Sequence, residues 1–212
     1  MDETRDLCRD LAHRHDEAGD PLGWFEALYK QAGGEFDTIP WADRGVNPNL
    51  AAWCDREGLP QPGARVLVVG CGLGNDAEYL AGRGAAVTAF DLSETAIKWC
   101  QRRFPQSTVS YQVGNLLEFT GEYDLVVEIN TLQAMPLAMR AEAIEAVGKL
   151  GHSLLIICRG REETDPPGQL PWPLTRADLA PLNNLGLSIQ NFEDFDDPSE
   201  SGTRRFRAYW RR

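Results

Sequence analysis

The chain has 212 residues, 42% of them hydrophobic and 25% charged, and these values are ordinary for one globular domain that spans the whole chain. Its formal net charge of -11 argues against nucleic acid or an anionic membrane as the main partner and favours a small-molecule substrate. The five cysteines and three histidines match no metal-ligand spacing, and no apolar run approaches the roughly 18 residues that span a bilayer. The cysteines indicate no disulfide framework, so we expect a cytoplasmic protein. We also expect a monomer or a homodimer with no bound metal.

The N-terminal part of the chain is predicted to be mainly helical. Residues 3–18 favour a helix, and a second helix is expected to begin with Asp20 as its N-cap and to end at Gly33. A loop rich in Pro, Gly and Asn follows, and then a short helix over residues 49–58. We expect residues 1–58 to form a cap or lid over the rest of the domain.

From residue 64 the pattern becomes a regular alternation of strands and helices. Since several of the strands are continuously apolar, the pattern indicates a parallel sheet that is covered on both faces, which is an α/β fold. The predicted strands are 64–70, 85–91, 108–114, 123–130 and 152–160, and the predicted helices are 76–84, 93–104 and 137–150.

The end of the chain departs from this alternation. A short helix is predicted over residues 175–186, and two strands, 187–195 and 204–212, are joined by a turn-rich link. With no room for a crossover helix, these two strands are expected to pair as an antiparallel hairpin. The last strand, "RRFRAYWRR", is basic, and we interpret it as an edge strand with a solvated face rather than a nucleic-acid patch.

The stretch "VLVVGCGLGND" combines an apolar strand with three glycines at alternate positions, Gly70, Gly72 and Gly74. A glycine turn between a strand and a helix places backbone N–H groups at the carboxyl edge of the sheet, where open α/β sheets bind ligands. The next strand ends in Asp91, whose carboxylate is placed to accept hydrogen bonds from both ribose hydroxyls of NAD or of S-adenosylmethionine (SAM). The alternative is that Asp91 only caps the following helix, although Ser93 is available for that role.

Two details favour SAM over a dinucleotide. Asn75 stands where the dinucleotide motif has its third glycine, and Asn75 and Asp76 together place an acidic, polar pair beside the turn. A carboxylate there is a poor neighbour for pyrophosphate and tolerates a cationic cofactor. After the third strand, Asn115 and the backbone N–H of Leu116 are placed to contact an adenine edge, unless Asn115 is an ordinary turn residue.

These motifs, in this order, make the chain similar to the class I SAM-dependent methyltransferases. More narrowly, it resembles the thiopurine S-methyltransferase family, which includes thiol and halide methyltransferases. The segments "GWFEALYKQAGGEFDTIPW", "YDLVVEINTLQAMPLAMRAEAI" and "DPPGQLPWPLTRADL" carry this narrower resemblance. It implies a Rossmann-like, seven-stranded, mostly parallel sheet in the order 3-2-1-4-5-7-6, with helices on both faces and a C-terminal antiparallel hairpin.

The resemblance also implies a set of site residues. Those expected to contact SAM, or its product S-adenosylhomocysteine (SAH), are Trp24, Trp41, Gly70, Cys71, Gly72, Gly74, Asp91, Leu92, Asn115, Leu116, Leu117, Glu128 and Ile129. Those expected to contact the methyl acceptor are Phe25, Trp41, Gln133, Met135, Arg140, Arg159 and Trp172. The alternative for each tryptophan is an ordinary core position, and for Cys71 a place where only a small side chain fits.

Catalysis is expected to depend on the kind of acceptor. A thiolate or other soft anion needs little help beyond positioning, whereas an oxygen or nitrogen acceptor generally needs a base. Glu128 is the first candidate for this base and Asp43 is the second. Arg140 is the candidate anion-binding group, unless it pairs with Glu142 or Glu145.

We therefore expect methyl transfer from SAM to a small molecule, most directly a thiol or another soft nucleophile. The alternatives are an NAD(P)-dependent oxidoreductase and a non-catalytic, SAM-binding regulator.

Overall fold

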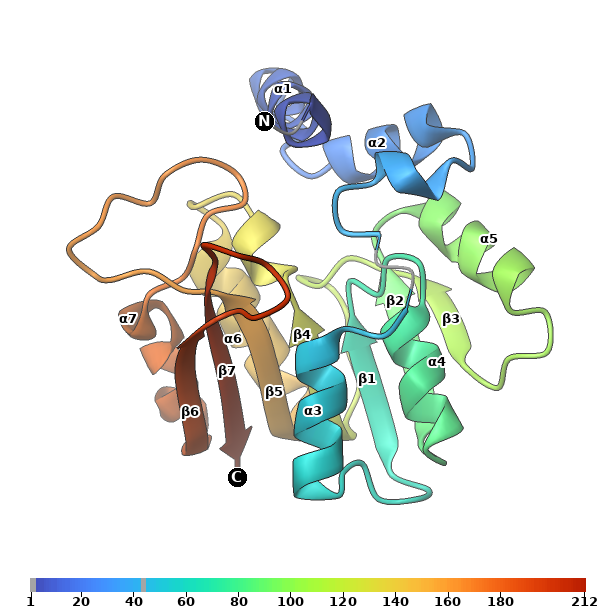
Figure 1. Cartoon of the computed structure of the whole chain (residues 1–212), viewed down its shortest axis with the longest axis vertical. Helices are drawn as coiled ribbons and strands as arrows, with labels where there is room; N and C mark the ends of the chain where they lie inside the picture. Colours follow the sequence, from blue (N-terminus) through green and yellow to red (C-terminus); the bar gives the residue numbers. More distant parts are fainter. Residues whose placement is uncertain (1–2, 43–44) are drawn as a thin grey trace.

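The strands form one mixed sheet. Over residues 3–42 and 45–212, which the computed structural model describes, the sheet has seven strands in the order β3-β2-β1-β4-β5-β7-β6 (Figure 1), and this confirms the predicted order. The strands are β1 (Arg65–Val69), β2 (Ala86–Asp91), β3 (Ser110–Val113), β4 (Tyr123–Ile129), β5 (Gly151–Arg159), β6 (Ser188–Asp196) and β7 (Arg204–Arg211). β1 to β5 pair in parallel, whereas β7 pairs antiparallel with both β5 and β6.

Helices cover both faces of this sheet, as predicted. On one face, α3 (Pro48–Glu57) and α4 (Asn75–Gly82) pack on the strands, and Leu50 and Trp53 of α3 share a buried cluster with Val68 of β1. On the other face, α6 (Arg140–Lys149), α7 (Arg176–Leu179) and the 3₁₀ helix η3 (Ala180–Leu185) share a cluster that includes Ile144 and Val126. Because both faces are buried, central strands have runs of consecutive apolar residues, such as 66–69 in β1 and 154–158 in β5, rather than alternating ones.

Two helices lie over the carboxyl edge of the sheet, α1 (Glu3–Glu17) and α2 (Trp24–Ala32), and α5 (Glu94–Arg103) adjoins α2 (Figure 1). The remaining short helices are η1 (Phe36–Thr38) and η2 (Leu132–Ala134). The predicted start of α2 at Asp20 is wrong: Gly23 is the N-cap, and Asp20 accepts the Gly23 N–H at 3.1 Å in the turn that precedes the helix. The expected cap of residues 1–58 is also too long, because α3 is buried on a face of the sheet.

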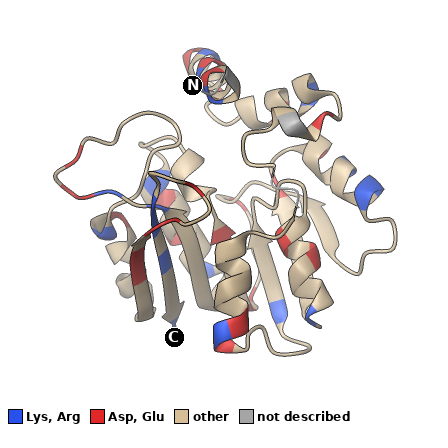
Figure 2. Ribbon diagram, in the orientation of Figure 1, with Lys and Arg blue, Asp and Glu red and all other residues tan. Residues whose placement is uncertain are grey.

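The basic last strand is not the edge strand that we expected. β7 lies between β5 and β6, where Arg205 and Arg207 are buried. Figure 2 shows basic positions on β7 beside acidic ones on β6 and on the loop between them. Arg207 Nε donates to Glu193 Oε2 at 2.6 Å, and Arg204 Nε donates to Asp194 Oδ1 at 2.7 Å. The arginines are therefore neutralised within the hairpin, because an inner strand leaves them little water for solvation.

Within the described part of the chain, no helix has the length and apolarity needed to cross a membrane, and no cluster of His, Cys, Asp and Glu is arranged to hold a metal ion.

Candidate functional site

A cavity of about 430 Å³ lies at the carboxyl edge of the parallel strands, below α1 and α2. The predicted site residues that line it are Trp24, Phe25, Trp41, Gly70, Cys71, Gly72, Asp91, Leu92, Asn115, Leu116, Ile129, Gln133, Met135 and Arg159. The predicted site residues that lie outside this lining are Gly74, Leu117, Glu128, Arg140 and Trp172. Asp43, the second candidate base, lies outside the described residues.

The glycine turn after β1 forms one wall of the cavity. Gly70, Gly72 and Gly74 have φ angles of 59°, 54° and 83°, a region that favours glycine. A Cβ at Gly70 would overlap the Thr131 hydroxyl, and a Cβ at Gly74 would lie 2.5 Å from the Tyr111 hydroxyl. Packing against Tyr111 thus requires a glycine at position 74. Gly74 is also the N-cap of α4 and does not line the cavity.

Asp91 sits at the end of β2 and is 7% exposed. Its Oδ2 accepts the Gly72 N–H and its Oδ1 accepts the Ser93 N–H, both at 2.9 Å. Burial raises the pKa of Asp91, while the two amides act in the opposite direction. Ser93 caps α5 through its hydroxyl, which accepts the Ala96 N–H at 3.0 Å, so Asp91 does not serve as that cap. Each carboxylate oxygen keeps acceptor capacity for a ligand hydroxyl.

The turn after β3 supplies a third wall. Asn115 Oδ1 accepts the Leu117 N–H at 3.1 Å within the turn. The side-chain amide nitrogen of Asn115 takes no part in this bond and is left for a ligand. Leu116 lies directly on the cavity, as does Gly114. A Cβ at Gly114 would lie 2.9 Å from the Phe119 ring, so the absence of a side chain there keeps this wall close to the sheet.

Aromatic side chains from α2 and the following loop cover the cavity. Trp24 stacks on Phe25 with ring centroids 4.0 Å apart, and Trp41 meets Trp24 edge-on at 5.9 Å. Trp41 Nε1 donates to the Tyr29 hydroxyl at 2.8 Å, and a Cβ at Gly72 would lie 3.2 Å from the same hydroxyl. The aromatic cover thus rests directly on the glycine turn, and aromatic faces of this kind attract cations.

Glu128 is buried in the core and does not reach the cavity. Its Oε1 accepts the Leu132 N–H at 2.9 Å, and its Oε2 has no hydrogen-bond partner among the described residues. Burial raises the pKa of Glu128 to about 7. Since a general base must lie within hydrogen-bond reach of the proton it removes, the structure argues against the predicted role of Glu128 as a base that touches the acceptor.

Arg140 is also placed differently from the prediction. It opens α6 under the proline-rich loop, where its Nη2 donates to the Trp172 carbonyl at 2.9 Å and its Nη1 lies 3.8 Å from Asp178. It pairs with neither Glu142 nor Glu145, because a side chain at the first helical position points back toward the preceding turn. The structure therefore gives Arg140 and Trp172 the role of holding the loop.

Three predicted acceptor residues do meet at the opposite end of the cavity. Met135 and Gln133 line it, and Gln133 Oε1 accepts the Arg159 N–H at 2.6 Å, which fixes the end of β5. Cys71 also lines the cavity, and its pKa is raised by a hydrogen bond with Cys100 and by burial, so it is a neutral thiol rather than a nucleophile.

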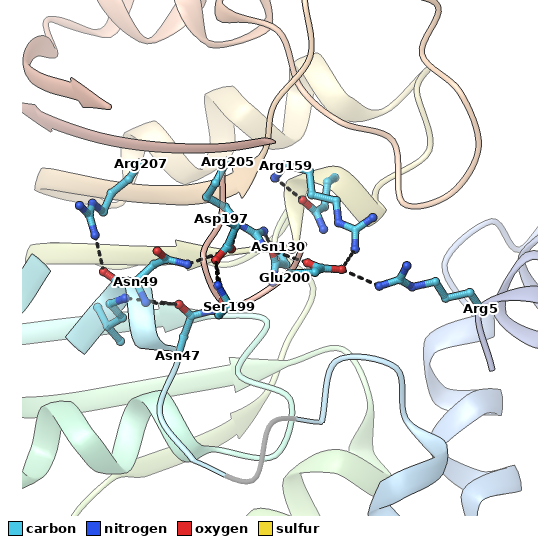
Figure 3. A network of polar contacts seen from close by, with 12 residues as sticks. Arg5, Asn47, Asn49, Asn130, Arg159, Asp197, Ser199, Glu200, Arg205 and Arg207 are labelled. Carbon is cyan, nitrogen blue, oxygen red and sulfur yellow. Dashed lines mark hydrogen bonds and ion pairs between the residues drawn. The ribbon is translucent and has the colours of Figure 1, made fainter. Parts of the chain in front are cut away.

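A polar network at this end was missed by the sequence analysis (Figure 3). It joins Asn49 of α3, Asn130 after β4, Arg205 of β7, and Asp197 and Glu200 in the link between β6 and β7. All five line the cavity. The alternating arginines of β7 are a visible signal in the sequence, but their partners are distant: Arg207 donates to the Asn49 carbonyl, 158 residues away along the chain.

A sequence model of the family "Thiopurine S-methyltransferase (TPMT)" matches residues 35–208. A ubiquinone biosynthesis O-methyltransferase of Thiobacillus denitrificans is 36% identical over 97 residues, which are 43% of this chain and 41% of the relative. The same enzyme of Bordetella bronchiseptica is 33% identical over 162 residues, 73% of this chain and 65% of the relative. The chain thus spans less than two thirds of each of these relatives.

A solved structure shares the fold. The magnesium protoporphyrin IX methyltransferase of Synechocystis with bound SAH superposes with a TM-score of 0.71 at 19% identity, over 89% of this chain and 98% of that chain. This likeness shows the Rossmann-like architecture of the methyltransferases. Because the family match over residues 35–208 spans most of the chain, the chain belongs to the thiopurine S-methyltransferase family of SAM-dependent methyltransferases.

Proposed function

We propose that this protein transfers the methyl group of SAM to a small molecule that carries a soft nucleophile, most directly a thiol. The observation that carries the proposal is one continuous cavity, whose described lining includes Gly70, Gly72 and Asp91 as well as Met135 and Arg159. It provides room for a nucleoside cofactor and a small acceptor together. The family match leaves the nicotinamide-dependent alternative without support, because the matching family uses SAM.

The residues present fit SAM. Asp91 offers a carboxylate to the ribose, and Asn115 and Leu116 offer an amide group and a backbone N–H to the adenine. The positive φ angles and missing side chains of Gly70 and Gly72 let a ligand approach the backbone closely. The aromatic cover suits a sulfonium. When bound, SAM supplies an electrophilic methyl group.

The protein's own contribution is to position the acceptor and to exclude water, as the aromatic cover does over the cavity. At the acceptor end, the carboxylates of Asp197 and Glu200 are each held by arginine, as described above. No histidine among the described residues lines the cavity. Because arginine holds both of these carboxylates, an acceptor that is already partly ionised at neutral pH is favoured, and a thiol meets that condition.

An oxygen acceptor is the second candidate, because the relatives named above are O-methyltransferases. It would require a proton acceptor. Among the described carboxylates that line the cavity, Asp91 is assigned to the ribose, which leaves Asp76, Asp197 and Glu200.

The proposal is tested in two steps. Titration calorimetry with SAH and with NAD is expected to show binding of SAH alone. Methyl transfer from SAM is then measured to a panel of thiophenol, iodide and phenol, with thiophenol expected to react fastest. A higher rate with phenol would establish the oxygen acceptor instead. Binding of SAH with no turnover on any acceptor would favour a regulatory protein over an enzyme.

A further inference from the structure

Three arginines from distant parts of the chain converge on one carboxylate at the acceptor end of the cavity (Figure 3). Glu200 Oε1 accepts from Arg5 Nη2 of α1 at 2.7 Å and from Arg159 Nη2 at the end of β5. Glu200 Oε2 accepts from Arg205 Nη2 of β7 at 3.0 Å. All four residues line the cavity. Glu200 therefore occupies the position that an anionic ligand of these guanidinium groups would take.

Arg205 is fully engaged within the protein. Besides Glu200, its Nε donates to Asp197 Oδ2 at 2.8 Å and its Nη1 donates to Asn130 Oδ1 at 3.0 Å. Its side chain is 6% exposed. These contacts make Arg205 an anchor that positions Glu200 rather than a group that is available to a ligand.

Arg159 differs from Arg205 in this respect. Its Nη2 is held by Glu200, whereas its Nε and Nη1 have no hydrogen-bond partner among the described residues. Its side chain is 18% exposed and lines the cavity. Burial lowers the pKa of Arg159, as do Arg5, Arg205 and Arg9, while Glu200 raises it. The guanidinium thus lines the cavity and retains unused donors.

The shape of the guanidinium and the lining of the cavity specify the ligand further. The planar fork of a guanidinium matches a carboxylate, which can accept from two of its N–H groups at once. Apolar side chains of Met135 and Leu170 also line the cavity and suit an apolar ligand body.

We propose that the methyl acceptor carries a carboxylate on an apolar body, and that the free donors of Arg159 bind this carboxylate beside Glu200. The inference rests on the proposed function, because it concerns the acceptor of the same cavity. Glu200 keeps the arginines in place, and its negative charge weakens their binding of a second anion.

The test compares benzoate with benzamide, which have the same shape and differ in charge, by titration calorimetry on the full-length protein saturated with SAH. Benzoate is expected to bind at least about 10-fold more tightly than benzamide. In Arg159→Gln this preference is expected to disappear, while the affinity for SAH stays within the error of the wild-type value. Lys149→Gln, an equal change of charge on the exposed end of α6, is the matched control and is expected to keep the preference.

A second variant tests the role assigned to Glu200. Glu200→Gln keeps an oxygen that accepts hydrogen bonds from the guanidinium groups but removes the competing charge. It is expected to bind benzoate several-fold more tightly than the wild type, with benzamide unchanged.

Three outcomes would overturn the inference: equal affinities for benzoate and benzamide, a preference that survives in Arg159→Gln, or weaker benzoate binding in a folded Glu200→Gln protein. SAH binding without a preference for benzoate contradicts this inference alone. Absence of SAH binding contradicts the proposed function as well.

Discussion

At the scale of single residues, Asp91 combines two tasks. It faces the cavity, and its two oxygens also hold the backbone amides of Gly72 and Ser93 at 2.9 Å. The same carboxylate therefore shapes the glycine turn and is available to a ribose. A substitution here is expected to affect the ligand through both routes.

We predict that Asp91→Ala weakens SAH binding by roughly 10-fold or more, because a charge-assisted pair of hydrogen bonds is lost. Calorimetry checks this value. Asp124→Ala is the matched control, since Asp124 also accepts a backbone N–H, that of Arg65 at 2.7 Å, at the opposite edge of the sheet. Equal SAH affinities in the two variants would remove Asp91 from the binding site.

Glu128 carries a second prediction at this scale. Its pKa is raised from 4.5 to about 7 by burial, so the folded protein holds the proton more tightly than the unfolded chain does. The stabilisation is therefore complete below pH 4.5 and is lost as the pH rises to about 7. Over that range the free energy of unfolding is expected to fall by about 3 kcal/mol on account of this one group.

Urea unfolding at pH 5 and pH 8 measures this effect. Glu128→Gln, which has no ionisable group at this position, is expected to lose about 3 kcal/mol less than the wild type between the two pH values. Glu145→Gln on the exposed face of α6 serves as the control and is expected to follow the wild type. The same pH dependence in Glu128→Gln as in the wild type would mean that Glu128 is ionised in the folded protein.

At the scale of elements, α2 is attached to the start of α5 through Glu26. Its Oε2 accepts from Ser93 Oγ at 2.5 Å and from Thr95 N at 3.1 Å, and its Oε1 accepts from Thr95 Oγ1 at 2.8 Å. Ser93 follows Asp91 by two residues. The aromatic cover and the end of β2 are therefore joined by one side chain.

We predict that Glu26→Ala speeds hydrogen exchange of the α2 amides by about 10-fold, because the Ser93 and Thr95 donors lose their partner. Hydrogen exchange followed by mass spectrometry resolves this peptide. Glu17→Ala on the exposed end of α1 is the control. If α2 exchanges equally in both variants, packing alone holds the cover in place.

At the scale of the whole molecule, the cavity is closed by contacts between segments that are far apart in the chain. Arg5 of α1 reaches Glu200, and Arg9 donates to the Leu170 carbonyl at 3.0 Å. We propose that α1 and α2 act as the lid over the acceptor end, with these two arginines tying α1 to the opposite side.

The double variant Arg5→Ala/Arg9→Ala is expected to raise the KM for a thiol acceptor by about 10-fold while the affinity for SAH stays unchanged, because both arginines lie at the acceptor end. Steady-state kinetics with thiophenol and calorimetry with SAH separate the two effects. Arg14→Ala, on the same helix and paired with Asp10, is the control. An unchanged KM would show that α1 does not close the site.

Much of the fold was predictable because it depends on local patterns. Continuously apolar runs such as 66–69, the cap at Ser93 and the glycine at position 33 depend on a few neighbouring residues, and the structure has each of them where the sequence predicts. The meeting of Gly72 and Asp91 at the cavity was predictable for the same reason, since they follow and end adjacent parallel strands.

The errors arose where the role of a residue depends on distant neighbours. Glu128 and Arg140 carry groups that suit catalysis, yet tertiary packing turns both away from the cavity. The arginines of β7 resemble a solvated edge because their partners, such as Glu193 and Glu200, are recognisable only once the hairpin has formed and joined β5.

By itself, the sequence determined the α/β architecture, the glycine turn and the acidic residue that follows the second strand, because periodicity, glycine conformation and strand ends are properties of short segments. The tertiary structure alone decided which charged groups meet at the acceptor end. Along the chain, Arg5 lies 154 residues before Arg159, and Arg159 lies 41 residues before Glu200. No local pattern relates residues that are so far apart. Their meeting depends on closure of the sheet by β7 and on the position of α1 over its edge.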